Sequence, residues 1–591
     1  MRNITTALAL AGLLFCYCAG EKPLPEAGDP NGGVHPTVQW IFACRADQAG
    51  FGCFPGDSAF TTRTGMALEA LSDLGALDRI EHRASLVGWL KARQNEDGGF
   101  YEKANFYGRD KKLPWGTISA LEPTYRAVRA LKILGAQPAR PEAAAGFIAA
   151  RQMPDGAFDS YEYSLGAAGA ALYTTYWAVA ALKELGAPVP DSAKVVDWAR
   201  RQQDTKAMRG GFSLSEDGFF FSSAQGTFYG AATLNLLGAE PKRPQAVKKF
   251  LLSSFGQEPE GGFELGHGND WNNHDHYSRT ADTYAGVNAL DLLGMPLSDT
   301  DTSRASRPAA DCAAWIASVQ NADGGFARFG VTDQTPVPCP SEMSATWQAV
   351  RSLNLLGQPV PRPANPAPPR EQIAIPNMRH RHPGIDFDDP VEVWAYRRIA
   401  APIYEHFLRE TGSRITAVGM LSRWAREATG PENQASDRHV EGRKPLFHGW
   451  GQCGTISWLL QALAASVDHP ARGAFVFADA NAEVQIQEDG WEKPHWVCYV
   501  PFTNEWIDPG LPTPEGTHNG WSALDLAIEF ATRVRDYNYI SLTSLGDHRY
   551  RRVWIENIDC VNGAWGQDSK IDTSMTYAGE VVELLYPDGI W

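Results

Sequence analysis

The sequence predicts a multidomain fold in which an all-α array of helical hairpins precedes an α+β region. Three observations predict it: a recurring Gly-Gly-Phe motif in the first part of the chain, a proline-rich stretch at 359–371, and short strand-like runs after that stretch. The chain has 591 residues, which is long enough for more than one packed core.

Composition excludes several classes of protein. With 43% hydrophobic and 21% charged residues, the chain is neither disordered nor collagen-like. Its formal net charge of −16 opposes nucleic acid or an anionic membrane surface as the main partner. We therefore expect no nucleic-acid partner.

The first expected element is an export signal over residues 1–20. Arg2 is followed by an apolar run over residues 6–17 and then by small residues, which is typical of a secretory signal peptide. The run is too short to remain in a bilayer as a span. Cys18 leaves an alternative open, a bacterial lipoprotein signal, whose lipid anchor would be the only membrane contact. Both alternatives predict an exported protein, either periplasmic, on the cell surface or secreted.

Seven cysteines follow the signal, and exported proteins commonly pair theirs in disulfides. An odd number leaves one thiol unpaired. The expected disulfides are Cys44–Cys53, Cys312–Cys339 and Cys498–Cys560, which leaves Cys453 as the thiol.

A repeat occupies residues 37–358 and uses many of the 56 glycines. Its first mark is Gly-Gly-Phe or a close variant, which ends at Phe51, Phe100, Phe158, Phe212, Phe263 and Phe326. Its second mark is a Leu-Gly pair, whose glycines are Gly75, Gly135, Gly186, Gly238, Gly294 and Gly357. These glycines lie 51 to 63 residues apart, which predicts six units that stack on one another.

Fixed residue types precede each Leu-Gly pair. The residue eleven positions before the glycine is Thr64, Thr124, Thr175, Thr227, Thr283 or Thr346. A small residue stands eight positions before it and a leucine four positions before it, as Ala67 and Leu71 do in the first unit. These offsets share one helix face, so we expect an inner helix that ends in a left-handed glycine and approaches its neighbours closely. A second helix is expected before each Gly-Gly-Phe, as at 86–94 and 313–320.

An aromatic residue stands ten positions before the glycine in five of the six units, and Gly65 replaces it in the first. These residues are Tyr125, Tyr176, Phe228, Tyr284 and Trp347. One interpretation is a central cavity for an apolar or extended ligand, lined by these rings. The other is that the rings wedge between neighbouring helices as core.

The motif at 94–100, followed by Thr124, Tyr125 and a Leu-Gly helix end, resembles the prenyltransferase and squalene-cyclase repeat. The resemblance covers residues 37–358. It implies an (α/α)6 toroid, with inner helices inside outer ones around a central cavity. It also implies one hypothesis for function, which is prenyltransferase- or terpene-cyclase-like catalysis in the toroid.

The resemblance can be tested against the zinc site of protein prenyltransferase β subunits, which is built from Asp, Cys and His. The aligned positions here are Arg279, Ala281 and Ala345, none of which is a zinc ligand. His274 and His276 could bind a metal only in a shifted register, and solvated loop histidines are the favoured interpretation. A metal in the toroid is therefore the minor expectation.

Class II terpene cyclases carry an Asp-x-Asp-Asp motif, and residues 386–389 match that string. The match follows the sixth repeat and so lies outside any cavity of the toroid, which favours coincidence. We therefore expect the toroid to bind a ligand or substrate rather than to catalyse.

Prolines at 359–371 predict a linker, and residues 372–591 form the second expected domain. Helices are expected at 391–410 and 415–428, and strands at 473–478, 495–501 and 550–555. This part is therefore α+β.

Cys453 follows a glycine-rich turn and opens an apolar helix, an arrangement that stabilises a thiolate. His495 begins a strand-like run, and Asp508 follows after thirteen residues. Nucleophile, base and orienting carboxylate are the roles of triad acyl transfer. With their flanks, these residues resemble the transglutaminase-like core of the papain superfamily over residues 440–512. For each residue alone, a core cysteine, a structural histidine or an Asp-Pro turn is the alternative.

The implied mechanism is attack of the Cys453 thiolate on an amide or ester carbonyl, with His495 as base and Asp508 orienting it. Gln452 is a candidate oxyanion donor, and the triad needs no cofactor. The substrate would be a protein, a peptide or another amide, and hydrolysis is favoured over transamidation. The alternatives are catalysis in the toroid and a non-catalytic binding or scaffold protein.

Overall fold

The computed structural model of the chain describes most of the repeat array and part of the region after it. The described residues are 33–46, 49–102, 118–159, 171–203, 210–213, 222–255, 261–264, 278–299, 308–331, 337–369, 375, 378–379, 385, 389–428, 430–431, 450–451, 453–476, 479–490, 494–499, 539–543 and 550–554. The expected export signal at 1–20 lies outside them, so export stays a prediction.

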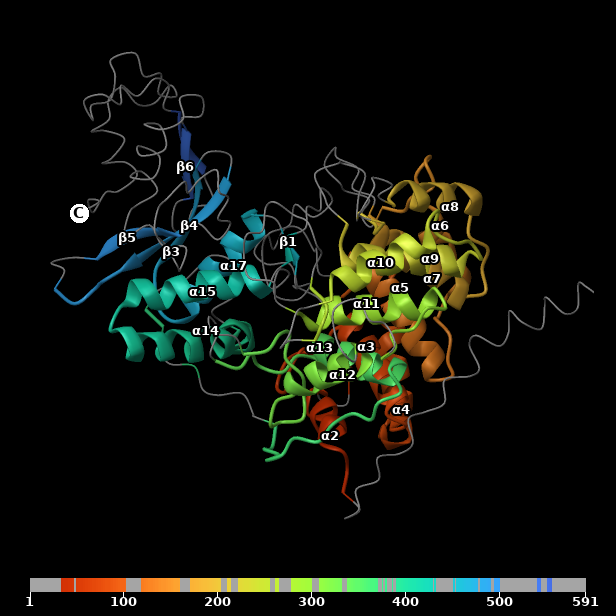
Figure 1. The fold of residues 1–591 in the computed structure, drawn as a ribbon, viewed down its shortest axis with the longest axis horizontal. Coiled ribbons are helices and arrows are strands. Elements are labelled where there is room, and N and C mark those ends of the chain that lie inside the picture. The colour runs from red at the N-terminus through yellow and green to blue at the C-terminus, as the bar shows by residue number, and fades with distance from the viewer. Residues whose placement is uncertain are drawn as a thin grey trace, which may run out of the picture.

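The repeat array is a closed α/α toroid, as its sequence pattern predicts (Figure 1). Its inner helices are α3 (Thr61–Asp73), α5 (Leu121–Ile133), α7 (Leu172–Glu184), α9 (Ala224–Leu236), α11 (Thr280–Leu292) and α13 (Met343–Leu355). Each inner helix packs on the next, and α13 returns to pack on α3, which closes the ring. The outer helices are α2 (Pro36–Ala43), α4 (Arg83–Lys91), α6 (Pro141–Ala149), α8 (Ser192–Arg201), α10 (Pro244–Ser253) and α12 (Pro308–Ser318). A short 3-10 helix, η2 (Leu77–Arg79), follows α3.

One hydrogen bond recurs in every repeat and joins its two sequence marks. The backbone N–H of each Gly-Gly-Phe phenylalanine donates to the side-chain oxygen of the inner-helix threonine, at 2.8 to 3.1 Å. The pairs are Phe51–Thr64, Phe100–Thr124, Phe158–Thr175, Phe212–Thr227, Phe263–Thr283 and Phe326–Thr346. All these threonines are buried, so the bond satisfies an N–H that would otherwise be stranded in the core.

The glycines behave partly as expected. Each Leu-Gly glycine has a φ between 63° and 69°, which confirms the left-handed helix end. In the two units whose small residue is glycine, that glycine lies against an aromatic ring. A Cβ on Gly230 would come within 2.4 Å of the Phe212 ring, and one on Gly286 within 2.5 Å of the Phe263 ring. In these units the glycine therefore makes room for the phenylalanine that the threonine anchors.

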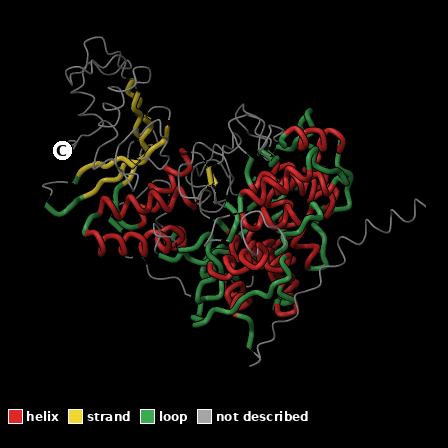
Figure 2. Tube along the Cα trace, in the orientation of Figure 1, coloured by secondary structure: helices red, strands yellow, loops and turns green. Residues whose placement is uncertain are grey.

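The region after the toroid, here named the C-terminal region, is α+β (Figure 2). Its helices are α14 (Pro390–Thr411), α15 (Arg414–Ala428) and α17 (Cys453–Ser466). Its strands are β1 (Gly430–Pro431), β2 (Trp450–Gly451), β3 (Ala471–Val476), β4 (Asp479–Ile486), β5 (His495–Tyr499), β6 (Tyr539–Thr543) and β7 (Tyr550–Trp554). Within the described residues, the main sheet has the order β5-β4-β3-β6-β7 with every pair antiparallel, and β1 pairs with β2 in parallel. Helix α17 packs on β3 and β4.

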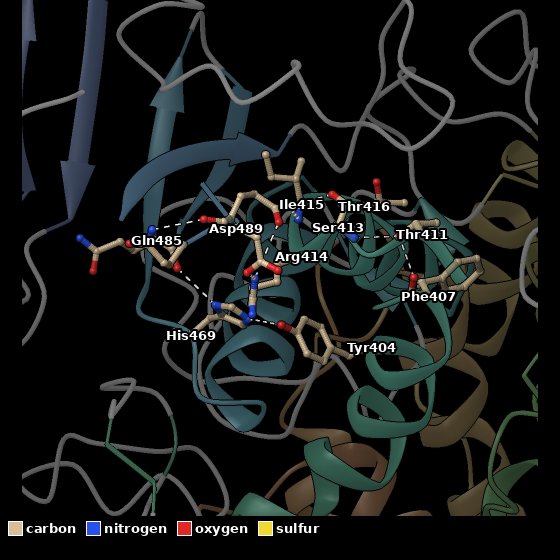
Figure 3. A network of polar contacts seen from close by, with 12 residues as sticks. Tyr404, Phe407, Thr411, Ser413, Arg414, Ile415, Thr416, His469, Gln485 and Asp489 are labelled. Atoms are coloured by element: carbon tan, nitrogen blue, oxygen red, sulfur yellow. Dashed lines mark hydrogen bonds and ion pairs between the residues drawn. The ribbon is translucent and has the colours of Figure 1, made fainter. Parts of the chain in front are cut away.

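A polar network ties the turn between α14 and α15 to the sheet (Figure 3). The carboxylate of Glu488, just after β4, accepts bonds from Ser413 Oγ at 2.8 Å and from the Ile415 N–H at 2.7 Å. His469 Nε2 lies 2.9 Å from the hydroxyl of Tyr404 on α14. The Glu488 carboxylate therefore satisfies an N–H at the start of α15 that the helix itself leaves unpaired.

The core of the C-terminal region continues into the edge of the toroid. Phe54 and Phe329 of the toroid belong to the same buried cluster as helices α14, α15 and α17. Arg398 of α14 donates from Nη2 to the backbone oxygen of Ser341 at 2.6 Å, and its guanidinium lies 4.2 Å from the centre of the Phe54 ring. These contacts fix the C-terminal region against the last repeat and the segment before α3.

Two of the expected disulfides, Cys44–Cys53 and Cys312–Cys339, are wrong, because Cys44 and Cys312 are thiols. The third, Cys498–Cys560, stays a prediction, since Cys560 lies outside the described residues. Cys312 and Cys339 belong to different buried clusters, and Cys339 Sγ accepts a bond from Trp424 Nε1 at 3.2 Å. In the part of the chain that the structure describes, no helix is both long and apolar enough to cross a bilayer.

Candidate functional site

The aromatic residues of the repeats form a nearly closed ring inside the toroid. Successive ring centroids lie 5.7 Å apart from Tyr125 to Tyr176, 5.6 Å to Phe228, 5.3 Å to Tyr284 and 4.6 Å to Trp347. Such spacings are those of packed aromatic pairs, of which Tyr125–Tyr176 and Phe228–Tyr284 are edge-to-face and the other two are tilted. The same rings line a cavity, so both interpretations of the sequence hold: the rings pack on one another and face a central space.

Arg126 fills the gap that the first repeat leaves. Gly65 has no side chain, and a Cβ there would lie 3.0 Å from the Cβ of Arg126. The Arg126 guanidinium lies 4.4 Å from the centre of the Trp347 ring and 5.4 Å from that of Tyr125. A cation on aromatic faces is a favourable contact, especially when it is shielded from water. The ring is therefore closed by five aromatic side chains and one guanidinium among the described residues.

Carboxylates hold the charge of Arg126 inside the toroid. Its Nη1 lies 3.2 Å from Glu69 Oε1, and its Nε lies 3.9 Å from Glu122 Oε1. Burial opposes the charge of Arg126, but the nearby carboxylate of Glu69 raises its pKa above the ordinary value. Glu69 also accepts a bond from Trp347 Nε1 at 3.1 Å, which links the pair to the aromatic ring.

The cavity lies on the N-terminal side of this ring. Its inner-helix lining comes from the first two turns of those helices and from Arg279, the N-cap of α11. The aromatic ring is therefore the floor, and Trp177 and Tyr229 extend the apolar wall. The cavity has a volume of about 90 Å³.

The rim of the cavity is polar and mostly cationic. Arg63, Arg279 and Arg328 line it together with Glu122 and Gln225. Burial raises the pKa of Glu122, and the charges of Arg126 and Arg63 oppose that rise. The rim therefore combines guanidinium groups with a carboxyl group that burial biases toward its neutral form.

One nitrogen of the Arg279 guanidinium is paired, and another has no partner among the described residues. Its Nε donates to Asp282 Oδ2 at 2.6 Å, and Asp282 Oδ1 accepts from Gln225 Nε2 at 3.0 Å. The buried Nη2 of Arg279 has no hydrogen-bond partner among the described residues. A buried N–H donor without a partner is costly, and an acceptor on a ligand would satisfy it.

The metal ligands of the prenyltransferase site do not occur at the aligned positions. Arg279 pairs with Asp282, Ala281 lines the cavity and Ala345 is buried in α13. His274 and His276 lie outside the described residues. Within the described part of the chain, no group of three or more His, Cys, Asp or Glu side chains could hold a metal ion.

Asp389, the last residue of the Asp-x-Asp-Asp string, has a structural role. It is the N-cap of α14, and its side chain accepts a bond from the Val391 N–H at 2.9 Å. A carboxylate at a helix N-terminus stabilises the helix, which accounts for this aspartate without catalysis.

The candidate triad falls partly inside the described structure. Cys453 is the first residue of α17, and His495 is the first residue of β5, where it pairs with Ile486 of β4. Gln452 and Asp508 lie outside the described residues. The elements therefore stand in the expected order, with the cysteine at a helix start and the histidine on the sheet that contacts this helix.

Sequence reasoning missed the charged part of the cavity. Arg126, Glu122, Arg279 and Arg328 occupy positions that differ in residue type from one repeat to the next, so the repeat pattern does not mark them. The missing aromatic residue in the first repeat could have indicated them, because it implies that another side chain fills the gap at Gly65.

Comparisons with known proteins agree with the toroid. The family model described as prenyltransferase alpha-alpha toroid domain matches residues 13–219 and 170–359, which together span 347 of the 591 residues. No curated protein matches the chain.

Solved structures of similar fold are distant. Candida albicans protein geranylgeranyltransferase-I complexed with GGPP is 18% identical, covers 50% of this chain and 83% of its own, and has a TM-score of 0.37. A type II terpene cyclase from Scytonema in complex with geranylgeranyl dihydroxybenzoate is 15% identical, covers 55% of this chain and 95% of its own, and has a TM-score of 0.37. Similarities at this level carry no argument about function.

Proposed function

The chain belongs to the prenyltransferase alpha-alpha toroid domain family, and we propose that its toroid binds the compact apolar end of an anionic or polar ligand. The observation that supports this best is the cavity itself, with a floor of packed aromatic rings and a rim of arginines. Its volume, about 90 Å³, is below the roughly 300–1,000 Å³ of drug-sized sites. It therefore suits one compact group, while the rest of a longer ligand would extend past the rim.

Arginines on the rim favour an oxygen anion beside the apolar group. Arg279 lines the cavity, and guanidinium groups bind carboxylates and phosphates strongly. Catalysis of prenyl transfer or cyclisation is the alternative that the family raises. The side chains at the aligned zinc positions do not support a metal-assisted transfer, so binding is the function proposed for the toroid.

The test is binding of 3-phenylpropanoate, a compact aromatic ring with a carboxylate, measured by calorimetry on the full chain. We expect Tyr284→Ala and Arg279→Gln each to weaken binding about tenfold, through lost ring contact and a lost charged hydrogen bond. Tyr101→Ala and Arg200→Gln are matched controls outside the cavity and should leave the Kd within about twofold. Equal Kd values in all five proteins would show that the ligand does not use this cavity.

A second candidate function is acyl transfer by Cys453. A specific observation favours it: α17 begins at Cys453 and packs on an antiparallel sheet whose edge strand begins at His495. A helix start lowers the pKa of a thiol there, and a neighbouring imidazole can take its proton.

Thiol reactivity tests this candidate directly. We expect iodoacetamide at pH 6.5 to modify Cys453 at least about tenfold faster than Cys53, because only a thiolate reacts. His495→Ala should remove that difference, and peptide mass mapping would read both thiols in one experiment. If Cys453 reacts no faster than Cys53, or if His495→Ala changes nothing, Cys453 is not an activated nucleophile.

A further inference from the structure

The toroid cavity is not built by the toroid alone. Ala428, the last residue of α15 in the C-terminal region, belongs to its lining. The neighbouring rim residue Arg328 donates from Nη1 to the backbone oxygen of Ala428 at 3.4 Å, while its Nε pairs with Glu342 Oε2 at 2.6 Å. One wall of the cavity mouth is therefore the end of α15.

The two ends of the cavity differ in chemistry. Its floor of aromatic rings lies toward the C-terminal ends of the inner helices, and beneath the floor Glu69 bonds to Arg126 and Trp347. Its rim lies at the N-terminal ends of those helices, where Arg328 and Ala428 are. An apolar group on the floor therefore points the remainder of its molecule toward the rim and the end of α15.

Only a few residues, through the paired strands β1 and β2, separate this rim from Cys453. Strand β1 begins two residues after Ala428, and it pairs in parallel with β2, so that Pro431 faces Gly451. Cys453 follows two residues after Gly451 and begins α17. Figure 1 shows β1 drawn between α17 and the toroid. With at most about 3.6 Å per residue and 4.8 Å between paired strands, the Cα atoms of Ala428 and Cys453 are no more than roughly 23 Å apart.

The interface between the toroid and the C-terminal region is tightly packed. Arg398 and Phe54 join α14 to the toroid edge, and Trp424 of α15 bonds to Cys339. Trp424 is 1% exposed, and it shares its buried cluster with the helix that Cys453 begins. The cavity rim and the start of α17 are thus held in one continuous core.

We propose that the toroid cavity and Cys453 are two ends of one active site, whose substrate is an acyl amide or ester with an apolar acyl chain. The end of the chain binds on the aromatic floor, and the carbonyl lies at Cys453. This proposal rests on both proposed functions, ligand binding by the toroid and acyl transfer by the cysteine, and adds that they act on the same molecule.

The chemistry balances with water as the second substrate. The Cys453 sulfur forms a bond to the acyl carbon as the bond from that carbon to the leaving nitrogen or oxygen breaks. His495 takes the thiol proton and gives it to the leaving amine or alcohol. Water then attacks the thioester: its hydroxyl joins the acyl carbon, the sulfur leaves, and the remaining proton returns to the thiol. The toroid contributes positioning of the chain, which lowers the entropic cost of the attack.

The experiment is a chain-length series on the full protein, using 4-nitrophenyl esters of acyl chains from two to sixteen carbons. Once the chain is long enough to enter the cavity, we expect kcat/KM to rise up to about fourfold per added methylene. Tyr284→Ala removes part of the floor, and Ala281→Trp fills the mouth, so both should flatten the rise. Tyr101→Ala is the control and should keep the rise. Cys453→Ala should abolish cleavage of every ester.

Three results separate the proposals. A Cys453-dependent rise that both cavity variants flatten supports a shared site. Cys453-dependent cleavage with no rise, or with a rise that neither variant changes, overturns the shared site while acyl transfer stands. If cleavage does not depend on Cys453 but 3-phenylpropanoate still binds in the cavity, acyl transfer fails, and the shared site fails with it.

Discussion

The repeat threonines of the toroid and the surface network of Figure 3 hold their polar groups at different depths. In the toroid, the threonines of the repeat are completely buried, and Glu102, next to the first inner helix, is 2% exposed. In the C-terminal region, the ion pair between Arg414 and Asp489 leaves the two side chains 32% and 90% exposed. Water screens the second kind of contact and not the first. Removing a buried hydrogen bond of the repeats should therefore be costly, whereas the network of Figure 3 can lose a surface pair at small cost.

The largest effect is expected for the buried carboxyl group of Glu102. Burial raises its pKa to about 7, although hydrogen bonds from Thr62 oppose the rise. The folded state therefore holds a proton that the unfolded chain loses near pH 4.5, so stability falls as the pH rises from about 4.5 to 7. Relative to Glu102→Gln, the wild-type protein should lose about 3 kcal/mol over that range, measured by denaturant unfolding.

The matched variant cancels the contribution of other carboxyl groups, because only Glu102 differs between the two proteins. A constant difference in the free energy of unfolding between pH 4.5 and 7 would mean that Glu102 titrates normally. Burial inside the toroid would then not raise the pKa of the carboxyl group at this position.

A smaller effect is expected for the repeated threonine bond. Thr124→Val removes the acceptor of the Phe100 N–H while keeping the shape of the side chain. A buried N–H left without a partner costs about 1–3 kcal/mol, which thermal or denaturant unfolding can measure. Thr233→Val is the control, because the buried hydroxyl of Thr233 has no partner among the described residues and its loss should be neutral or stabilising. Equal destabilisation by both substitutions would contradict the role given to the repeated bond.

The smallest effect is expected at the surface of the C-terminal region. Arg414→Gln breaks the 3.0 Å pair with Asp489 and should cost at most about 0.5 kcal/mol in the free energy of unfolding. The cost should shrink in 1 M salt, since screening weakens exposed pairs. A loss comparable to that of Thr124→Val would mean that the two regions do not differ in the way proposed.

The repeats explain why much of the toroid could be predicted from the sequence. The glycine and threonine spacings appear once per unit, so each position is observed several times within a single chain, and Gly75 and Gly135 could be assigned to helix ends. The bond between Phe100 and Thr124 was not predicted, because spacing alone does not say which groups meet. The closed cavity floor was not predicted either, since it depends on Arg126 crossing to the position of Gly65.

The C-terminal region has no such internal repetition. Helices α14 and α15 and strands β3, β5 and β7 lie near the ranges that local sequence patterns predict. Strand β4 was missed, although β3 and β5 both depend on it in the sheet. The contact of Ala428 with the toroid cavity joins residues far apart in sequence, and no local pattern marks such a contact.

A crystal structure with 3-(4-bromophenyl)propanoate tests most directly whether the aromatic-floored cavity of the toroid is a ligand site. The anomalous signal of bromine locates the ligand ring independently of the rest of the electron density. We expect a bromine peak above the rings of Tyr176, Phe228 and Tyr284, with the carboxylate at Arg279. Bromine bound elsewhere on the protein, with the cavity filled only by water, would contradict it.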